Sequence, residues 1–450
     1  MNSFKTFFSC LLLLFSSSFY SIDLIVTTTG QVGTYTTLSS ALVAANSGDR
    51  ILISNIITLY ENDTIDKSVT ILPLNSGSRF IMVGSITVKA EANTEIRIVG
   101  MELTGDINSI SGSADGYNLC QFYMIDCEIL GGYDINCDVL GLSLNLLFSK
   151  LTSNNSHVTF KQGNLIANEI TSGFTINNGI GINFNDTTNI IANRIGGSKL
   201  INNSDHFFFI ANNYFFLDVL IIKSSNLNSN GENNLLNNTF QNSANQGSGA
   251  TNLVLHHNFQ HYQTVILNNI FLLKNSSGLV DGNQHIGVSQ YYNQTPITLN
   301  TSDAPKLVRN NAFLNDLGIN SVKSSVYVYA RLLIGSPFTG ATGFDIDSIN
   351  YINSFPTNSD FLLIDVAPLF INVNNSGKVI TELIDAGENF PKYYDIDLTR
   401  NDLGTFGGPY SWDNYWNTNN GRARIYELEA PFELPPNQTF NIKSSASHNH

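Results

Sequence analysis

Charged side chains are scarce in this chain, at 13% of its 450 residues. Lys and Arg together number 22 against 36 Asp and Glu, which gives a formal net charge of −14. A chain of this sign repels polyanions overall, so nucleic acid is not expected as a partner. Asn and Ser are abundant instead, and they predict a surface that forms hydrogen bonds with neutral amide and hydroxyl groups.

Cysteine is also rare, with four residues in the chain. Cys10 lies in the N-terminal segment, which leaves Cys120, Cys127 and Cys137 for the folded protein. An odd number permits at most one bridge, so the chain is not a disulfide scaffold. We interpret all three as small core residues.

Long apolar runs are missing after the N-terminus. The run Phe7–Phe15 follows Lys5 and precedes the small residues Ser16–Ser18. It is too short to span a membrane and is typical of a secretory signal peptide, here residues 1–21. The sequence therefore predicts a secreted or cell-surface protein without a membrane span.

A three-residue pattern recurs along the chain, mostly at steps of 19 to 26 residues. Its first member is usually Asn, its second is polar or charged, and its third is Leu, Ile or Phe. The copies begin at Met101, Cys127, Ser149, Asn168, Asn193, Asn213, Asn238 and His257, with further copies at Asn269 and Asn311. The step of 12 between His257 and Asn269 is too short for a full coil, so one of these two copies is expected to lie elsewhere.

Such a step is one turn of a solenoid. The regular leucine frame of leucine-rich repeats is missing, and short β-branched and aromatic runs alternate with Asn, Ser and Gly, which predicts three short strands and turns per coil. We therefore expect an all-β, right-handed parallel β-helix. Asn168, Asn193, Asn213 and Asn238 are predicted to stack as a structural Asn ladder and to take the left-handed turn conformation.

Both ends of a solenoid need covering. At the N-terminus Thr37 is expected to cap a short helix that carries Leu38, Ala41, Leu42 and Ala45 on one face and stops by Gly48. The stretch Gly33-Thr34-Tyr35-Thr36-Thr37-Leu38, followed by Gly48-Asp49-Arg50-Ile51, resembles the opening of β-helix proteins of the pectin-lyase superfamily. This resemblance implies their fold.

Near the other end, the segment from Asp385-Ala386-Gly387 to Gly407-Gly408-Pro409 resembles the closing segment of secreted bacterial β-helix proteins, where it ends the last coil. The resemblances imply a β-helix over residues 22–409. Residues 410–450 are predicted to be a separate tail with two short strands, Arg424–Phe432 and Thr439–Ser444, which forms a hairpin and contacts a secretion or anchoring system.

The middle members of the triplets give one candidate binding surface. They lie between inward residues and should point outward. One interpretation is a surface salt-bridge ladder of Glu128, Lys150, Glu169 and Arg194. The other is a polysaccharide groove in which Lys150 and Arg194, beside Glu169, face uronate or sulfate groups and Tyr214 is a stacking platform.

Two further groups are candidates. Trp412 and Trp416 would stack on sugars if exposed, or plug the last coil if buried. Asp395, Asp397 and Asp402 are weak candidates for Ca²⁺, although they lack the spacing of an EF-hand loop and suit turn-capping salt-bridged to Arg400. We otherwise expect no metal or cofactor.

No complete catalytic signature is present, and no catalytic residue is assigned. We expect a carbohydrate-associated surface protein that binds an extended extracellular polysaccharide on a sheet face. The rivals are a polysaccharide lyase or glycoside hydrolase, and a purely structural or adhesive rod.

Overall fold

The structure is a computed structural model of the chain. It describes residues 21–27, 31–115, 117–153, 155–178, 187–203, 207–217, 220–224, 233–243, 251–256, 264–274, 284–289, 307–309, 312–315, 384–385, 387–416, 423–429 and 443–448. The predicted signal peptide therefore lies outside the described residues, apart from Ser21.

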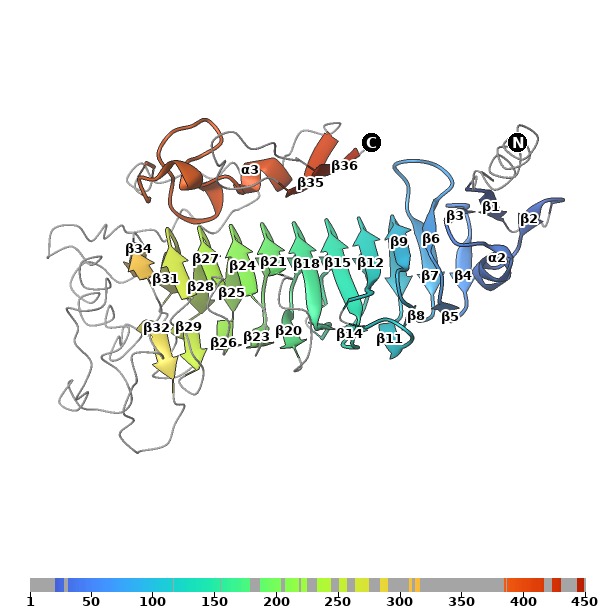
Figure 1. Ribbon diagram of the computed structural model, residues 1–450, viewed down its shortest axis with the longest axis horizontal. Coiled ribbons are helices and arrows are strands. Elements are labelled where there is room, and N and C mark those ends of the chain that lie inside the picture. Colours follow the sequence, from blue (N-terminus) through green and yellow to red (C-terminus); the bar gives the residue numbers. More distant parts are fainter. Residues whose placement is uncertain are drawn as a thin grey trace, which may run out of the picture.

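Three parallel sheets run side by side along an elongated rod (Figure 1). Sheet A has 13 strands: β2 Thr34–Tyr35, β1 Asp23–Val26, β3 Asp49–Ile53, β6 Val69–Pro73, β9 Glu95–Val99, β12 Cys120–Ile125, β15 Leu142–Leu147, β18 Gln162–Ile166, β21 Thr187–Ile191, β24 Phe207–Ala211, β27 Asn233–Leu236, β30 Thr264–Leu267 and β33 Leu307–Arg309.

Sheet B has 11 strands: β4 Thr58–Tyr60, β7 Phe80–Val83, β10 Met101–Thr104, β13 Glu128–Ile129, β16 Lys150–Leu151, β19 Glu169–Ile170, β22 Arg194–Ile195, β25 Tyr214–Leu217, β28 Thr239–Ser243, β31 Ile270–Lys274 and β34 Ala312–Asn315. Sheet C has ten: β5 Asp63–Ile65, β8 Ile86–Ala90, β11 Ile107–Ser111, β14 Ile135–Cys137, β17 Val158–Phe160, β20 Gly173–Asn178, β23 Ser198–Asn203, β26 Leu220–Ser224, β29 Thr251–His256 and β32 Gln284–Ser289.

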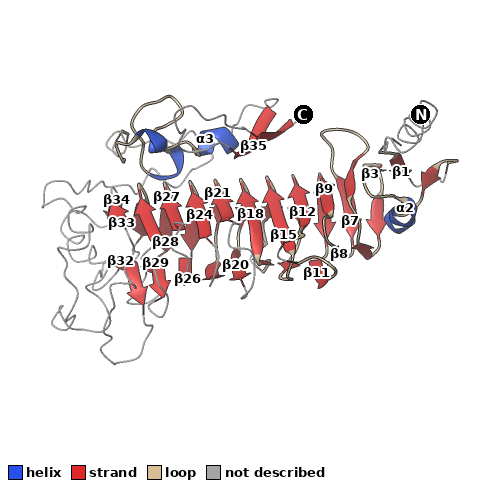
Figure 2. Ribbon diagram, in the orientation of Figure 1, coloured by secondary structure: helices blue, strands red, loops and turns tan. Residues whose placement is uncertain are grey.

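Each coil gives one strand to each sheet in the order A, B, C, so successive coils stack in parallel. The predicted all-β parallel β-helix is confirmed, and strands dominate the described residues (Figure 2). The predicted rungs also pair: Glu102 faces Glu128, Glu128 faces Lys150, and the register continues through Glu169 and Arg194 to Tyr214.

The 12-residue step between the copies at His257 and Asn269 is explained by the pairing of β28 with β31, which places Thr239 opposite Ile270. The copy at Asn269 therefore continues the sheet. The copy at His257-Asn258-Phe259 lies outside the described residues.

The core fills the inside of the coils. Inward residues form one apolar cluster that extends from Leu24 to Ile266 and includes many fully buried Phe side chains. Cys120, Cys127 and Cys137 are buried in it as free thiols, which confirms their predicted role as small core residues. Burial raises the pKa of Cys127 to about 12, which keeps this thiol protonated and unreactive.

A short helix, α2 Leu38–Ala44, covers the N-terminal coil. The Thr37 side chain accepts a hydrogen bond from the Ser40 N–H, as predicted, and Leu38, Ala41 and Leu42 are buried. The carboxylate of Glu61 accepts two further helix N–H groups, from Leu38 at 2.7 Å and Ser39 at 3.1 Å. The helix ends before Gly48, at the Ala45 cap.

The C-terminal part differs from expectation. We call Gly387–Trp416 the C-terminal strap; it contains the 3-10 helices η7 Pro391–Tyr393 and η8 Gly404–Phe406 and the helix α3 Trp412–Tyr415. The prediction that this segment ends the last coil is wrong, because the strap lies along the outside of the rod over several coils (Figure 1). An apolar outer column of sheet A, which includes Leu147, Ile166 and Ile191, receives its aromatic residues.

Beyond the strap, β35 Ala423–Glu429 and β36 Lys443–His448 pair antiparallel. The predicted tail hairpin exists, although its second strand lies later than expected. Among the described helices, none is both long and apolar enough to cross a membrane.

Candidate functional site

The predicted Asn ladder is a buried stack at the corner between sheets A and B. The Oδ1 of Asn193 accepts the backbone N–H of Asn168 at 2.8 Å and its side-chain amide at 2.9 Å. Asn193 donates in the same way to Asn213, and the pattern continues through Asn238 to Asn269. Each side-chain amide also donates to a strand carbonyl, as Asn193 does to Leu165. The ladder is therefore a self-satisfied structural feature.

The left-handed conformation belongs to a different residue from the one predicted. Each corner between sheets A and B, from the one after β12 to the one after β30, has two residues, and the first has positive φ: Asp126, Phe148, Ala167, Ala192, Asn212, Asn237 and Asn268. The second residue, which is the ladder member, points inward instead. The first residue turns the chain, and this leaves its own side chain on the outside of the corner.

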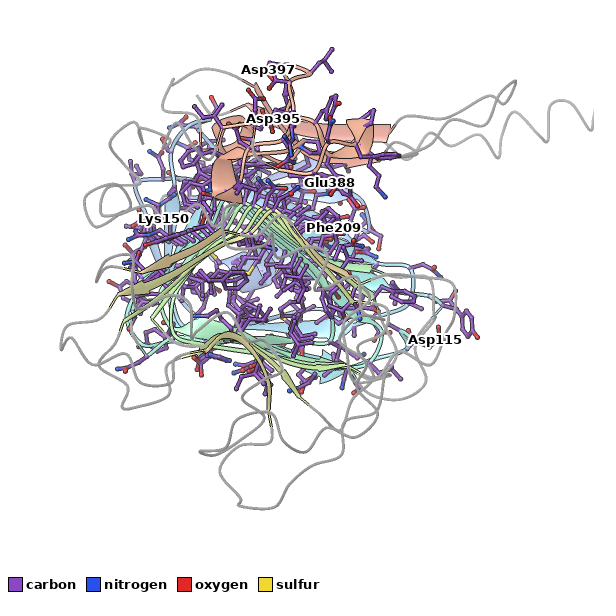
Figure 3. The ribbon with its side chains drawn as sticks, turned by 90° about the vertical axis from the view of Figure 1, so that its left-hand side faces the viewer. Asp115, Lys150, Phe209, Glu388, Asp395 and Asp397 are labelled. Carbon is purple, nitrogen blue, oxygen red and sulfur yellow. The ribbon has the colours of Figure 1, made fainter. Side chains whose placement is uncertain are left out.

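The outer column of sheet B is only partly the predicted ion-pair ladder. Arg194 Nη1 lies 2.5 Å from Glu169 Oε1, whereas Glu128 pairs with Arg79 at 2.6 Å. Lys150 is exposed and has no ion-pair partner among the described residues. Figure 3 shows Lys150 on one side of the rod and Phe209, from sheet A, on another. On this face, Lys150 is therefore a cation without an ion pair to any residue that the structure describes.

Tyr214, the predicted stacking platform, is 7% exposed and lies beneath the strap. Its ring stacks on Phe216 at 5.8 Å and meets Trp412 edge-on at 6.4 Å, while Trp412 stacks on Trp416 at 5.3 Å. Burial raises the pKa of Tyr214 to about 12. The structure thus joins five of the six predicted binding residues, from Glu169 through Arg194 to Trp416, in one packed cluster and leaves Lys150 outside it.

The two tryptophans do not plug the last coil. The indole N–H of Trp412 donates to the Asn212 carbonyl and that of Trp416 to the Ala192 carbonyl, both at 2.5 Å. These carbonyls belong to corner residues in the middle of the rod. The tryptophans fasten the strap to its side.

The three aspartates of the weak Ca²⁺ candidate accept backbone N–H groups, and for Asp402 the donor is Asp385, just before the strap, at 2.7 Å. Asp395 accepts N–H groups of Asp402 and Gly408, and Asp397 accepts the Thr399 N–H at 3.0 Å. Burial raises the pKa of Asp395 to about 6. Asp397 lies on the outer side of the strap, away from the sheets (Figure 3). Within the described part of the chain, no group of three or more acidic, Cys or His residues is placed to hold a metal.

Arg400, which the turn-capping interpretation paired with these carboxylates, donates its Nε–H to the Gly387 carbonyl at 2.7 Å. The aspartates and Arg400 therefore help to fold the strap on itself.

Sheet C carries a polar column that the triplet pattern did not predict. Its six rungs pair in register and consist of hydroxyl and amide side chains without charge: Thr64, Thr87, Asn108, Asn136, Thr159 and Thr175. Thr64 and Asn136 are exposed and the other four are half-buried, as expected for outward residues between neighbouring strands. Their strand neighbours, such as Ile107 and Ile135, are buried. We call these six residues the sheet C column.

An imidazole ring and charged side chains flank this column in its later coils. His157 Nε2 lies 2.8 Å from the Thr175 hydroxyl, and burial lowers the pKa of His157. Lys161 lies 3.4 Å from Asp138, and the Asn177 amide donates to the same carboxylate at 3.3 Å. The arrangement suits hydrogen bonding to many hydroxyl groups along a line.

Comparisons with known proteins add no identity. A scan against protein-family models, a search of curated proteins and a search of solved structures each found no match to this chain. The structure itself assigns the chain to the parallel β-solenoids.

Proposed function

We propose that the protein is a secreted or cell-surface β-helix rod of the pectin-lyase-like kind that binds an extended polysaccharide along the outer face of sheet C. The observation that carries the proposal is the sheet C column: six uncharged hydroxyl and amide side chains in one register on an open face. The N-terminal segment with its signal-peptide pattern supports the extracellular setting.

The column has the geometry that a repeating polymer needs. Successive rungs of a sheet lie about 4.8 Å apart, so the six side chains form a straight row of donors and acceptors. Thr hydroxyls and Asn amides both donate and accept, which matches sugar hydroxyl groups in either role. A rigid parallel solenoid holds the row straight without an ordering cost on binding.

The charge of the two open faces favours sheet C over sheet B. Sheet B presents an exposed Lys150, a half-buried Glu102 and an Arg194 that is already paired with Glu169. The six rungs of the sheet C column are neutral, so a hydroxyl-rich polymer loses no ion pair when it binds there. The polymer class is therefore neutral or weakly charged polysaccharide.

The test is a pull-down of the purified mature chain with insoluble neutral polysaccharides, cellulose and chitin. The double variant Thr87→Val with Thr159→Val removes two hydroxyls and keeps the β-branched shape. At about 0.5–1.5 kcal/mol per hydrogen bond, the loss of two should weaken binding by about five-fold to a hundred-fold. The control Thr104→Val makes the same change on sheet B.

Unchanged binding by the double variant would contradict the sheet C site. If the wild-type chain binds none of these polymers, the structural or adhesive rod becomes the preferred function. The same incubation detects cleavage, since a lyase releases an unsaturated product that absorbs ultraviolet light.

A further inference from the structure

The strap docks through the outward side chains of the corner between sheets A and B. Asn212 donates to the carbonyls of Thr405 and Gly407, at 3.1 and 2.5 Å. Asn237 exchanges amide hydrogen bonds with Asn401 at 2.7 and 3.3 Å. Successive corners thus bind successive parts of the strap, which runs back toward the N-terminal end of the rod.

The Asn268 corner binds the beginning of this path. Its Oδ1 accepts the Glu388 N–H and its carbonyl accepts the Gly404 N–H, both at 2.9 Å. Figure 3 shows Glu388 on the side of the strap that faces the rod. The strap is therefore held by hydrogen bonds from corner residues as well as by its aromatic side chains.

An unbroken set of contacts connects the docked strap with the charged face of sheet B. Trp412 packs on Tyr214, Tyr214 stacks on Phe216, and the Arg194 guanidinium lies over the Phe216 ring at 5.1 Å. Gly196 leaves room for that ring, since a Cβ there would lie 2.8 Å from it. The position of Arg194 thus depends on a ring that the strap holds from the other side.

Arg194 is incompletely satisfied in this position. Its Nη1 bonds Glu169, but its buried Nε–H has no hydrogen-bond partner. Arg normally presents its N–H groups to an anion in pairs, so a bidentate carboxylate or sulfate would satisfy it better. Lys150 lies two rungs away in the same column with its ammonium group exposed.

We propose that Arg194 and Lys150 form a second site, for carboxylated or sulfated polysaccharide, that the docked C-terminal strap holds closed. In the closed form Arg194 lies on Phe216 and pairs with Glu169. An anion that draws Arg194 outward loosens the contact with Phe216, Tyr214 and Trp412. Coupling is reciprocal, so release of the strap raises the affinity for the anion by the same factor.

Two matched glutamate variants test the site, with polygalacturonate as the carboxylate probe, dextran sulfate as the sulfate probe and dextran as the neutral control. Glu169→Gln frees Arg194 from its ion pair. Glu102→Gln removes the same charge from the same column, at a carboxylate that has no ion pair with the residues described in the structure. At low ionic strength, where screening is weak, Glu169→Gln should bind the polyanions roughly two- to five-fold more tightly than Glu102→Gln. The preferred probe identifies the anionic group.

Two matched asparagine variants test the closure. Asn212→Gly keeps the positive φ but removes the two side-chain hydrogen bonds to the strap carbonyls of Thr405 and Gly407. Asn93→Gly makes the same change at an exposed turn with φ of 56°. The chain's two tryptophans both lie in the strap, so their fluorescence reports docking. Asn212→Gly should shift the emission to longer wavelength and bind polyanion more tightly than Asn93→Gly. Polyanion should shift the wild-type emission in the same direction.

Three results would overturn the inference: equal affinities for the two glutamate variants, polyanion binding without a change in tryptophan emission, or no polyanion binding in any variant. Cellulose and chitin binding is measured on the same samples. Failure at Arg194 and Lys150 is thereby distinguished from failure of the sheet C column.

Discussion

Two stacks of hydrogen-bonding side chains run along this rod, one inside and one outside. The inner stack is the ladder of Asn168, Asn193, Asn213, Asn238 and Asn269. The side-chain carbonyl of Asn168 accepts one N–H group from the preceding coil, and each of the other four accepts two. In the sheet C column, Asn108 and Asn136 stand among threonines that face water. Asn therefore forms hydrogen bonds within the protein in the inner stack, and its amide remains available to a ligand in the outer one.

The difference comes from position in the coil. A ladder Asn follows a left-handed corner residue, which directs its amide inward against strand carbonyls. A sheet C residue lies in mid-strand between two inward neighbours, so it must point outward. Removal of a buried ladder Asn should therefore lower the free energy of unfolding strongly, whereas removal of an exposed sheet C side chain should lower it little.

The largest effect is expected at the ladder. Asn193→Ala leaves the buried N–H of Asn168 without its acceptor, so the free energy of unfolding should fall by about 1–3 kcal/mol in urea denaturation. Asn136→Ala, at an exposed rung, should change it by less than about 0.5 kcal/mol. Equal losses would mean that the two stacks do not differ as described.

The outer side of the same corner should give the next effect. Asn237→Gly keeps the turn but removes two donated hydrogen bonds to the strap, at 2.7 Å each. We expect a loss of about 1–2 kcal/mol, with a shift of tryptophan emission. Asn93→Gly is the control, and identical melting curves for the two variants would contradict strap docking at Asn237.

Two carboxylates, Asp63, which is buried, and Asp395, which is half-buried, should make stability depend on pH. Burial, and then the charge of Glu61, raises the pKa of Asp63 to about 6, and burial does the same for Asp395. The folded state then binds these protons more tightly than the unfolded state, so stability falls as pH rises from about 4 to 6.

Asp63→Asn should reduce the fall in unfolding free energy between pH 4 and pH 7 by on the order of 1 kcal/mol. Asp395→Asn should reduce it further. Urea denaturation at pH 4 and pH 7 measures it. A slope that both variants retain would contradict the burial of these carboxyl groups.

The smallest effect on stability is expected on the charged face. Lys150→Ala with Arg194→Ala removes one ion pair, which is worth about 0–1 kcal/mol because both partners are partly exposed. Polyanion binding should be lost even so. A stable double variant that still binds polyanion would place the anion site elsewhere.

The fold was predictable because one corner keeps a constant length. Two residues separate sheet A from sheet B in each coil from β12 onward, so the triplet starting at Asn168 falls in register with the one starting at Asn193. The outward column from Glu102 to Tyr214 followed from this register. Ladder membership followed too, although the left-handed turn was assigned to the Asn itself and not to the residue before it.

The sheet C column and the strap could not be predicted in the same way. Two residues separate β10 from β11, but six separate β16 from β17, so Asn108 and Thr159 share no fixed spacing from their triplets. The strap depends on contacts such as that of Trp412 with Asn212, 200 residues apart. The aromatic residues of the strap indicated a packing surface, but the local sequence pattern did not predict which coils they would contact.

The central claim is that sheet C is the binding surface and the ladder is structural. Retention of folded protein on insoluble neutral polysaccharide, compared between Asn136→Ala and Asn193→Ala, tests it most directly. We predict that Asn136→Ala binds several-fold less than wild type, while Asn193→Ala binds normally per folded molecule. The claim is contradicted if Asn136→Ala binds like wild type, or if folded Asn193→Ala loses as much binding.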